Sequence, residues 1–157
     1  MRLMLISAAA AFLVDQVSKV GVVHGLNLDQ RLVIEVLPPL LVFRMGWNTG
    51  INFGLFDNGT EIMRWVLVGL AVAVSIWLLL WGRNGLVRPI AHVSAGLIIG
   101  GALGNALDRV VYGAVADFLN MSCCGISNPF AFNLADVAIF AGAVGLIFFA
   151  DPPKKTT

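Results

Sequence analysis

The sequence predicts an all-α membrane protein: a four-transmembrane-helix bundle with a small β element on its outer side. Of the 157 residues, 59% are hydrophobic and 12% are charged, and the mean hydropathy is +0.89. A soluble domain is closer to half apolar and a quarter charged. Four segments of about 20 mostly apolar residues, the length that crosses the hydrocarbon core, follow one another along the chain. A chain of this size fits a single membrane domain over residues 1–157.

The first two predicted spans cover residues 3–23 and 62–81. Asp15, Ser18 and Lys19 interrupt the first span. Tryptophans stand near the ends of the second span, where indole rings favour the membrane interface.

The third predicted span, residues 89–107, starts with Pro89, which suits a first helical turn because its missing N–H is not needed there. A stripe of small residues along this span lets another helix approach closely. The stripe consists of Gly96, Gly100, Gly101 and Gly104. We expect close packing here and no phosphate-binding loop.

The fourth predicted span, residues 129–150, follows Asn128, which is a typical helix-capping residue, and ends before a pair of prolines. The uncharged part of this span after Asp136 has 14 residues, which is too short to cross a bilayer alone. Asp136 is therefore expected inside the membrane-embedded helix.

The density of lysine and arginine in the loops predicts how the chain is oriented in the membrane. With the N-terminus inside, five Lys and Arg residues fall in short inner segments and four in much longer outer ones, so both termini are predicted to be cytoplasmic. The loop of residues 24–61 then lies on the outer side. Its proline-broken run of Val, Ile, Leu and Phe is too short for a span and is typical of a small β element at the membrane surface.

Composition also limits the partners and cofactors. Ten basic and nine acidic residues leave a net charge of +1, so no nucleic-acid partner is expected. The two cysteines, Cys123 and Cys124, are adjacent and have neither a CxxC spacing nor a histidine cluster beside them. We therefore expect no disulfide framework and no metal site.

Polar residues that are far apart in the sequence are expected to meet near the outer surface. A rise of about 1.5 Å per helical residue gives the depth of each one. The members are Asp15 and Lys19 of the first span, Asn105, Asp108 and Arg109 at the end of the third, Asp117 in the next loop, and Asn133 and Asp136 in the fourth. Charged groups at such depth are expensive and usually functional, so this layer is the candidate site.

Two acids in this layer lack a cation nearby in the sequence. Asp15 has Lys19 four residues later on the same helix face, whereas Asp117 and Asp136 have no Lys or Arg within seven residues. Two close carboxylates in a low dielectric are expected to share a proton. Such a pair can work as an aspartic protease does: one carboxylate takes a proton from the attacking water and the other supplies one to the oxyanion. The sequence does not distinguish the two roles.

Other interpretations of these residues stay open at this point. Asn133 and Asp136, three residues apart, also fit a helix-capping pair. Ser18 with Lys19 leaves a serine–lysine mechanism as a further alternative. Buried acids also suit a small proton-coupled transporter or channel subunit, although the inner halves of the spans carry no acid to continue a relay. A structural or assembly factor without chemistry is the last alternative.

Five segments together resemble one family, the lipoprotein signal peptidases (signal peptidase II). They are DQVSK at residues 15–19, NTGINFG at 48–54, GALGNALDR at 101–109, VADF at 115–118 and FNLAD at 132–136. The segments follow the family's order and cover the chain nearly end to end. Asn52 departs from the family, which commonly has alanine before the phenylalanine, and this difference affects the lip of the expected pocket.

The resemblance implies an aspartyl peptidase of the bacterial inner membrane whose active site faces the periplasm. Such enzymes cut the signal peptide from a prolipoprotein just before the cysteine that carries diacylglycerol. The resemblance implies that Asp117 and Asp136 are the catalytic pair. It gives pocket-shaping or substrate-binding roles to Asp15, Lys19, Asn48, Gly50, Phe53, Gly104, Asn105, Arg109, Asn133 and Ala135.

The expected partners are a diacylglyceryl-modified prolipoprotein and membrane lipids, and the enzyme is expected to be monomeric. Acid–base catalysis by paired carboxylates needs only water, so no cofactor is expected. A lipid-modified substrate keeps its acyl chains in the bilayer while its scissile peptide reaches water, which suits a pair at the interface. The outer β element and residues 48–56 are expected to cover the substrate, with Trp47 and Phe53 as interface contacts.

Overall fold

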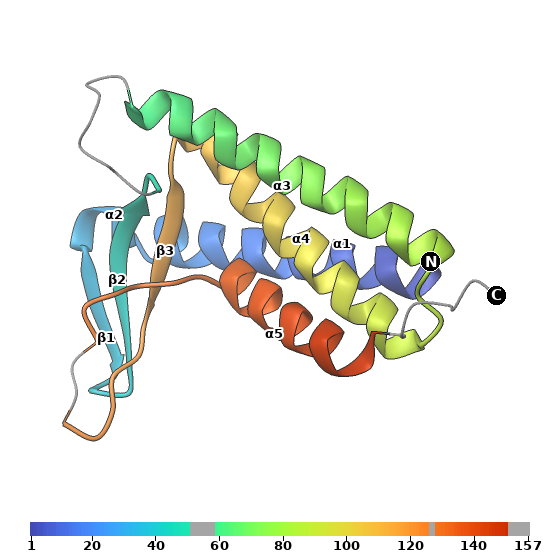
Figure 1. Cartoon of the computed structure of the whole chain (residues 1–157). Helices are drawn as coiled ribbons and strands as arrows, with labels where there is room; N and C mark the ends of the chain where they lie inside the picture. Colours follow the sequence, from blue (N-terminus) through green and yellow to red (C-terminus); the bar gives the residue numbers. More distant parts are fainter. Residues whose placement is uncertain (51–58, 126–127, 151–157) are drawn as a thin grey trace.

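The computed structural model describes residues 1–50, 59–125 and 128–150. Four long helices lie side by side, and a small sheet stands at one end of them (Figure 1). The elements in chain order are α1 (Arg2–Lys19), a π-helical turn η1 (Val20–Gly25), α2 (Leu28–Arg31), β1 (Val33–Leu37), β2 (Leu41–Asn48), α3 (Gly59–Asn84), α4 (Pro89–Tyr112), β3 (Val115–Asn120) and α5 (Leu134–Phe149).

All four predicted apolar segments form helices. Three helices are long and apolar enough to cross a membrane, namely α1 with η1, α3 and α4, whereas α5 has 16 residues and is a shorter apolar helix. The helix α4 continues five residues beyond the predicted end at 107 and stops at Gly113, whose φ of 81° is left-handed and favours glycine.

The predicted start of the fourth helix at residue 129 is wrong. Residues 128–132 are not helical, and Asn133 is the N-cap of α5. The side chain of Asn133 accepts from the backbone N–H of Asp136, and the Asp136 side chain accepts from the backbone N–H of Asn133. This reciprocal capping box satisfies backbone donors that Asn128 cannot reach.

The central helix is α4, which packs against α1, α3 and α5. The predicted glycine stripe forms its close contacts. Gly96 and Gly100 face the backbone of α1, and a Cβ placed on Gly101 would lie 2.5 Å from the carbonyl oxygen of Ala135 in α5. Small residues therefore let α1 and α5 approach α4 from two sides.

The sheet is antiparallel, with strand order β1–β2–β3. The predicted outer loop supplies β1 and β2, as well as the short helix α2. The strand β3 was not predicted, and it comes from the connection between α4 and α5. Its pairing with β2 places Gly46 opposite Asp117 and Asn48 opposite Val115, so two segments of the expected site lie on neighbouring strands.

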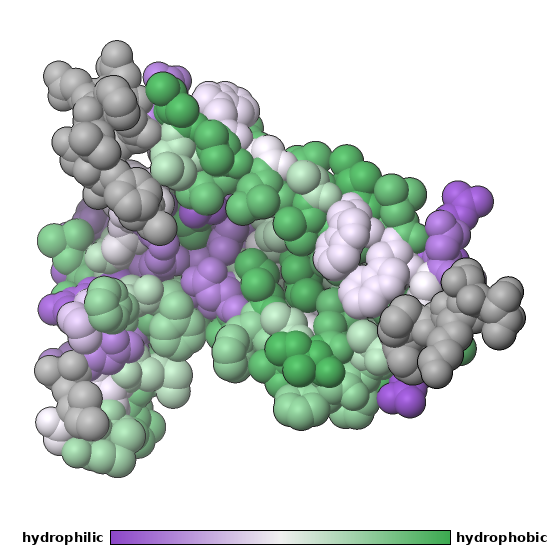
Figure 2. All heavy atoms as spheres, viewed as in Figure 1, coloured by the Kyte–Doolittle hydropathy of each residue, from purple (hydrophilic) through white to green (hydrophobic). Residues whose placement is uncertain are grey.

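Polar and apolar side chains are distributed as in a membrane protein. Apolar side chains cover the helices, and hydrophilic ones gather in a hollow between the helices and the sheet (Figure 2). An apolar core lies at the end of the bundle away from the sheet and consists of Met4, Leu78, Leu86, Ala91, Ala95 and Ile99. The buried polar residues include Asp15, Lys19, Asn105, Asp108, Asp117 and Asn133.

Candidate active site

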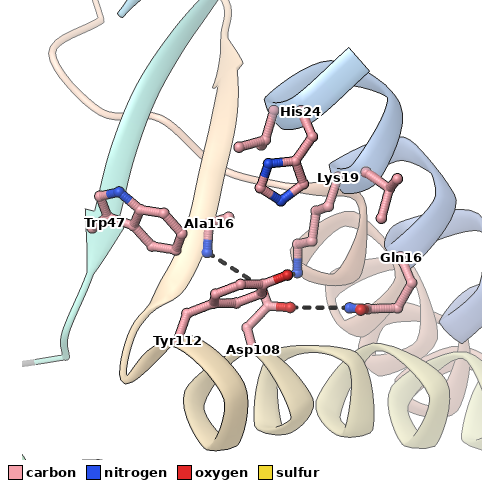
Figure 3. A pocket seen from close by; sticks show the side chains of 9 residues that line it. Gln16, Lys19, His24, Trp47, Asp108, Tyr112 and Ala116 are labelled. Atoms are coloured by element: carbon pink, nitrogen blue, oxygen red, sulfur yellow. Dashed lines mark hydrogen bonds and ion pairs between the residues drawn. The ribbon is translucent and has the colours of Figure 1, made fainter. Parts of the chain in front are cut away.

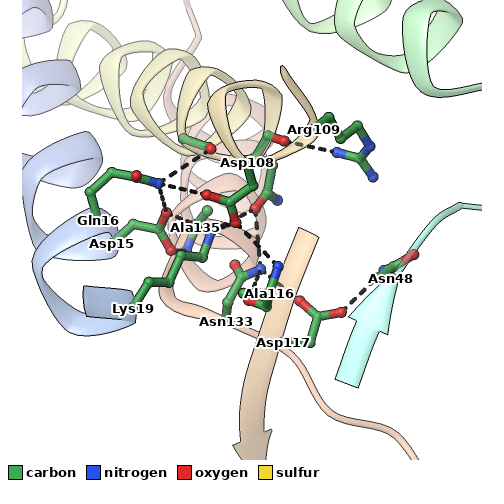
Figure 4. Close-up of polar contacts among 12 residues, drawn as sticks. Asp15, Gln16, Lys19, Asn48, Asp108, Arg109, Ala116, Asp117, Asn133 and Ala135 are labelled. Carbon is green, nitrogen blue, oxygen red and sulfur yellow. Dashed lines mark hydrogen bonds and ion pairs between the residues drawn. The ribbon is translucent and has the colours of Figure 1, made fainter. Parts of the chain in front are cut away.

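Asp117 extends from β3 where the sheet meets the helices (Figure 4). Its side chain is held on both sides: Oδ1 accepts a 2.7 Å hydrogen bond from Nδ2 of Asn133, and Oδ2 accepts a 3.1 Å hydrogen bond from Nδ2 of Asn48. Only 5% of Asp117 is exposed. Burial, followed by the negative charge of Asp136, raises the pKa of Asp117 from its usual 3.8 to about 6, against the opposing effect of the two amide donors.

Asp136 lies in the first turn of α5 and is half-buried. Its Oδ1 accepts a 2.9 Å hydrogen bond from Nδ2 of Asn105, and its Oδ2 accepts a 3.2 Å hydrogen bond from the backbone N–H of Asn133. The capping interpretation of Asn133 and Asp136 is therefore confirmed. It leaves Oδ1 turned toward Asn105, so capping does not use the whole carboxyl group.

Asn133 links the two acids. Its side chain donates to Asp117 while its backbone N–H donates to Asp136. Within the described residues, no hydrogen bond joins the two carboxyl groups directly, and their sharing of a proton stays a prediction. They are nevertheless close enough for the charge of Asp136 to act on Asp117. Asn133 therefore connects the two acids, and the charge of Asp136 acts on Asp117.

Asn105 and Arg109 complete this side of the site. Oδ1 of Asn105 accepts from Nδ2 of Asn133 at 3.1 Å and from Nζ of Lys19 at 3.2 Å. Nη1 of Arg109 donates to the Asn105 carbonyl oxygen at 3.2 Å. Nε of Arg109 is buried and has no hydrogen-bond partner among the described residues.

Lys19 forms ion pairs with two buried carboxylates. Its Nζ lies 2.8 Å from Oδ2 of Asp15, as the spacing predicted, and 2.7 Å from Oδ2 of Asp108. Nε2 of Gln16 lies within 3.1 Å of one oxygen of each of these carboxylates. The sequence placed Asp108 in the expected polar layer but gave it no role there, and it did not point to Gln16. We call Asp15, Gln16, Lys19 and Asp108 the Lys19 cluster.

Several other expected site residues also gather here. Asn48, at the exposed end of β2, accepts from the backbone N–H of Gly50 at 2.9 Å. Gly50 has a φ of 95°, and a Cβ there would lie 2.8 Å from Leu67 of α3. A Cβ on Gly104 would lie 2.8 Å from Oδ2 of Asp15. Phe53 and Asn52 lie outside the described residues.

The serine–lysine alternative finds no matching geometry in the described part of the chain. Oγ of Ser18 donates to the carbonyl oxygen of Asp15 at 2.7 Å, and Lys19 bonds to carboxylates and an amide. Both cysteines are exposed and free. No three His, Cys, Asp or Glu side chains in the described ranges are arranged to hold a metal ion.

A small pocket lies beside the Lys19 cluster (Figure 3). Lys19, Asp108, Trp47, Tyr112 and Ala116 are among the residues that line it. Because side chains alternate along a strand, Ala116 faces this pocket while the next side chain of β3 points to the other face of the sheet. The pocket therefore lies on the opposite face of β3 from Asp117.

The comparisons with known proteins agree with this geometry. Residues 7–150 match the family model of Signal peptidase (SPase) II. A lipoprotein signal peptidase of Methylobacterium sp. (strain 4-46) is 43% identical over 91% of this chain and 85% of its own length. One from Rhodopseudomonas palustris (strain ATCC BAA-98 / CGA009) is 36% identical over 94% of this chain and 90% of its own.

Solved structures show the same fold. A bacterial membrane enzyme solved by the in meso method at 1.9 Å resolution has a TM-score of 0.77 and 24% identity, and the match covers 92% of this chain and 90% of that chain. A second such structure, at 2.3 Å resolution, has a TM-score of 0.72 and 24% identity, with 92% and 85% covered. The chain therefore belongs to the lipoprotein signal peptidase (signal peptidase II) family of aspartic peptidases, which are multi-pass bacterial membrane enzymes.

Proposed function

We propose that this enzyme hydrolyses its substrate by activating water between Asp117 and Asp136. As a lipoprotein signal peptidase, it cleaves signal peptides from prolipoproteins. The observation that carries the proposal is the single residue, Asn133, that hydrogen bonds to both carboxyl groups and holds them in one polar site. Aspartic protease chemistry requires a pair of carboxyl groups that share one proton.

The environments of the two acids suggest how the roles divide. Burial and the charge of Asp136 raise the pKa of Asp117 to about 6, so Asp117 is the carboxyl group that holds the proton of the pair. Asp136 then removes a proton from water as the water oxygen bonds to the scissile carbonyl carbon. Asp117 gives its proton to the carbonyl oxygen.

Collapse of the intermediate completes the reaction. The C–N bond breaks, and the proton held by Asp136 goes to the leaving amine. Asp117 recovers its proton from the collapsing hydroxyl group. The signal peptide leaves with a new carboxyl group, and the lipoprotein keeps a free amino group.

The proposed substrate is a prolipoprotein that carries diacylglycerol on the cysteine after the cut. The helices expose apolar side chains along their length, where acyl chains and a signal helix can lie. The coupled acids lie where the helices meet the sheet, so the scissile peptide can reach water while the lipid stays in the bilayer. One chain supplies both acids, and we accordingly propose a monomer that contacts membrane lipids.

We further propose four spans, with both termini cytoplasmic and the site facing the periplasm across the inner membrane. The start of α1 and the end of α5 lie at the end of the bundle away from the sheet (Figure 1). Arg83 and Arg88 flank the α3–α4 connection at that same end, which fits a cytoplasmic side. With 16 residues α5 is about 24 Å long, so its first turn would lie below the outer surface of a hydrocarbon core of roughly 30 Å.

The test uses the variants Asp117→Asn and Asp136→Asn, with Asp29→Asn of the exposed helix α2 as a matched control. The solubilised enzymes are given a diacylglyceryl-modified precursor and the same precursor without lipid. We expect each of the two site variants to lose about 10³-fold or more in kcat/KM while keeping the wild-type melting temperature within a few degrees. Substantial cleavage by either variant would exclude the two-carboxylate mechanism, and equal cleavage of both precursors would exclude the lipid requirement.

A further inference from the structure

Two backbone N–H groups occupy equivalent places next to the proposed catalytic acids. The N–H of Ala116, just before Asp117, donates to Oδ2 of Asp108 at 3.2 Å. The N–H of Ala135, just before Asp136, donates to Oδ1 of Asp15 at 2.9 Å. The peptide group before each proposed catalytic residue is thus held by a buried carboxylate. For Asp117 this is Asp108 of α4, and for Asp136 it is Asp15 of α1.

Lys19 joins these two carboxylates. Its ammonium group lies 2.8 Å from Asp15 and 2.7 Å from Asp108, and the three residues are 5% exposed or less. One positive charge faces two negative ones, so the cluster needs further donors to stabilise its second carboxylate. The two backbone N–H groups supply part of this need.

Gln16 supplies a further hydrogen-bond donor to the two carboxylates. Its Nε2 is 3.1 Å from Oδ2 of Asp15, 3.1 Å from Oδ1 of Asp108 and 3.3 Å from the carbonyl oxygen of Gly104. All three neighbours accept hydrogen bonds, so the amide nitrogen must face them. Figures 3 and 4 show the Gln16 side chain reaching toward Asp108 from α1. A neutral donor at this place links the two carboxylates without adding charge.

We propose that Gln16 and Asp108 are positioning residues for the peptidase reaction: with Asp15 and Lys19 they set the separation of Asp117 and Asp136 through the backbone of Ala116 and Ala135. The proposal rests on the proposed function, since it takes these two acids as the catalytic pair. No contact that the structure describes joins Gln16 to either acid, so its effect on the reaction passes through the Lys19 cluster.

The fold makes such a device necessary. Asp117 stands on a strand and Asp136 on a helix, and their carboxyl groups have no direct hydrogen bond within the described residues. Apart from the bonds of Asn133, their separation depends on how firmly the sheet and α5 are held in place. The Lys19 cluster ties both to α1 and α4, and misplacement of reacting groups by about 1 Å can reduce a rate roughly 10²-fold.

The test measures kcat, KM and the pH profile of the full-length enzyme in detergent with a lipidated precursor. The variants are Gln16→Met, which keeps the side-chain length, and Gln16→Glu, which adds a third carboxylate to one ammonium. Gln30→Met on α2 is the matched control, because Gln30 is the only other glutamine and its side chain is exposed. If Gln16→Met does not fold, Gln16→Asn, which keeps the amide but is one methylene shorter, takes its place.

We expect Gln16→Met to lower kcat about tenfold with KM within twofold, and Gln16→Glu to lower kcat further. If the separation of Asp117 and Asp136 is less fixed in the variant, the charge of Asp136 also has a weaker effect on Asp117. The pKa of Asp117 then falls, and the alkaline limb of kcat/KM moves to lower pH. Gln30→Met is expected to match the wild type in all three readouts.

A double variant tests the route of the effect. If Gln16 acts through Asp108, the kcat loss of Gln16→Met with Asp108→Asn is smaller than the product of the two single losses. Independent, multiplying losses would overturn the link between the two residues. A Gln16→Met enzyme with lower thermal stability but unchanged kcat and pH limb would show a merely structural role.

The two proposals fail in different ways. If Asp117→Asn and Asp136→Asn are inactive while Gln16→Met behaves as wild type, the positioning role is wrong and the catalytic pair stands. If either of the two aspartate variants cleaves substrate, the catalytic pair is wrong and the positioning role falls with it.

Discussion

The side-chain amide of Asn133 donates a 2.7 Å hydrogen bond to Oδ1 of Asp117. The same residue caps α5 through its reciprocal bonds with Asp136. A capping residue thus also sets the position of a carboxyl group on a strand of the sheet. Asn133 can therefore be the cap of α5 and a part of the proposed site at the same time.

Asn133→Ala is expected to lower kcat about 10²-fold, because both acids lose a shared support. Loss of the cap should also lower the free energy of unfolding by about 1 kcal/mol. Cleavage kinetics and denaturation in micelles measure the two effects. Asn128→Ala, in the preceding non-helical segment, is the control, and equal kcat in the two variants would contradict the prediction.

The stability of the enzyme should depend on pH through Asp117. Its pKa is about 6 in the folded protein, above the usual 3.8, so the folded state binds more protons than the unfolded state between these values. This contribution is present below pH 4 and is lost as the pH rises through about 6, with an upper size of about 3 kcal/mol. Asp117→Asn should lack this part of the pH dependence of the melting temperature, while Asp29→Asn retains it. If the melting temperature changes with pH equally in the wild type and in Asp117→Asn, the raised pKa of Asp117 is wrong.

Gly101→Ala should disturb both packing and catalysis. The new Cβ would lie 2.5 Å from the carbonyl oxygen of Ala135 and 2.9 Å from Ile139, so α5 must move away from α4. We expect a loss of roughly 1–3 kcal/mol in stability, together with reduced kcat. Gly69→Ala on α3 has no atom within 4 Å of its new Cβ and is expected to be neutral or up to about 1 kcal/mol stabilising. Thermal unfolding and cleavage rates of the two variants separate these expectations.

The two native cysteines can test the orientation. Cys123 and Cys124 are exposed in the turn after β3, at the sheet end of the molecule. A membrane-impermeant maleimide should label them in intact spheroplasts. A variant with both cysteines changed to serine and with Arg83→Cys, at the other end of α3, should be labelled only after permeabilisation. The reverse pattern would contradict the proposed topology.

Local patterns predicted the helices well. Apolar length, capping residues and glycine spacing act within one segment, and α1, α3 and α4 appear where these patterns placed them. The strand β3 was missed because its pairing with β2 is a long-range contact. The wrong start of α5 had a signal in the sequence: Asn133 is followed three residues later by Asp136, as in a capping box, whereas Asn128 has no acid at the matching place.

The expected polar layer does come together in the structure, but its pairings were only partly foreseeable. Asp15 with Lys19 is a local i, i+4 pair and was predictable. Asp108 was noted beside Arg109, although neighbours on a helix do not face each other; its partner is Lys19 on another helix. Gln16 carries no charge, so a search for charged groups passed over it. The catalytic roles of Asp117 and Asp136 stay predictions.

The hydrogen bond from Ala135 to Asp15 connects residues that are 120 positions apart, in the first and the last helix of the chain. During synthesis, α1 is made long before its partner in α5 exists. Until the last helix inserts, Asp15 lacks one of its donors and Asp136 has no place in the site. On the proposed mechanism, the nascent chain therefore cannot cleave its substrate before α5 has inserted.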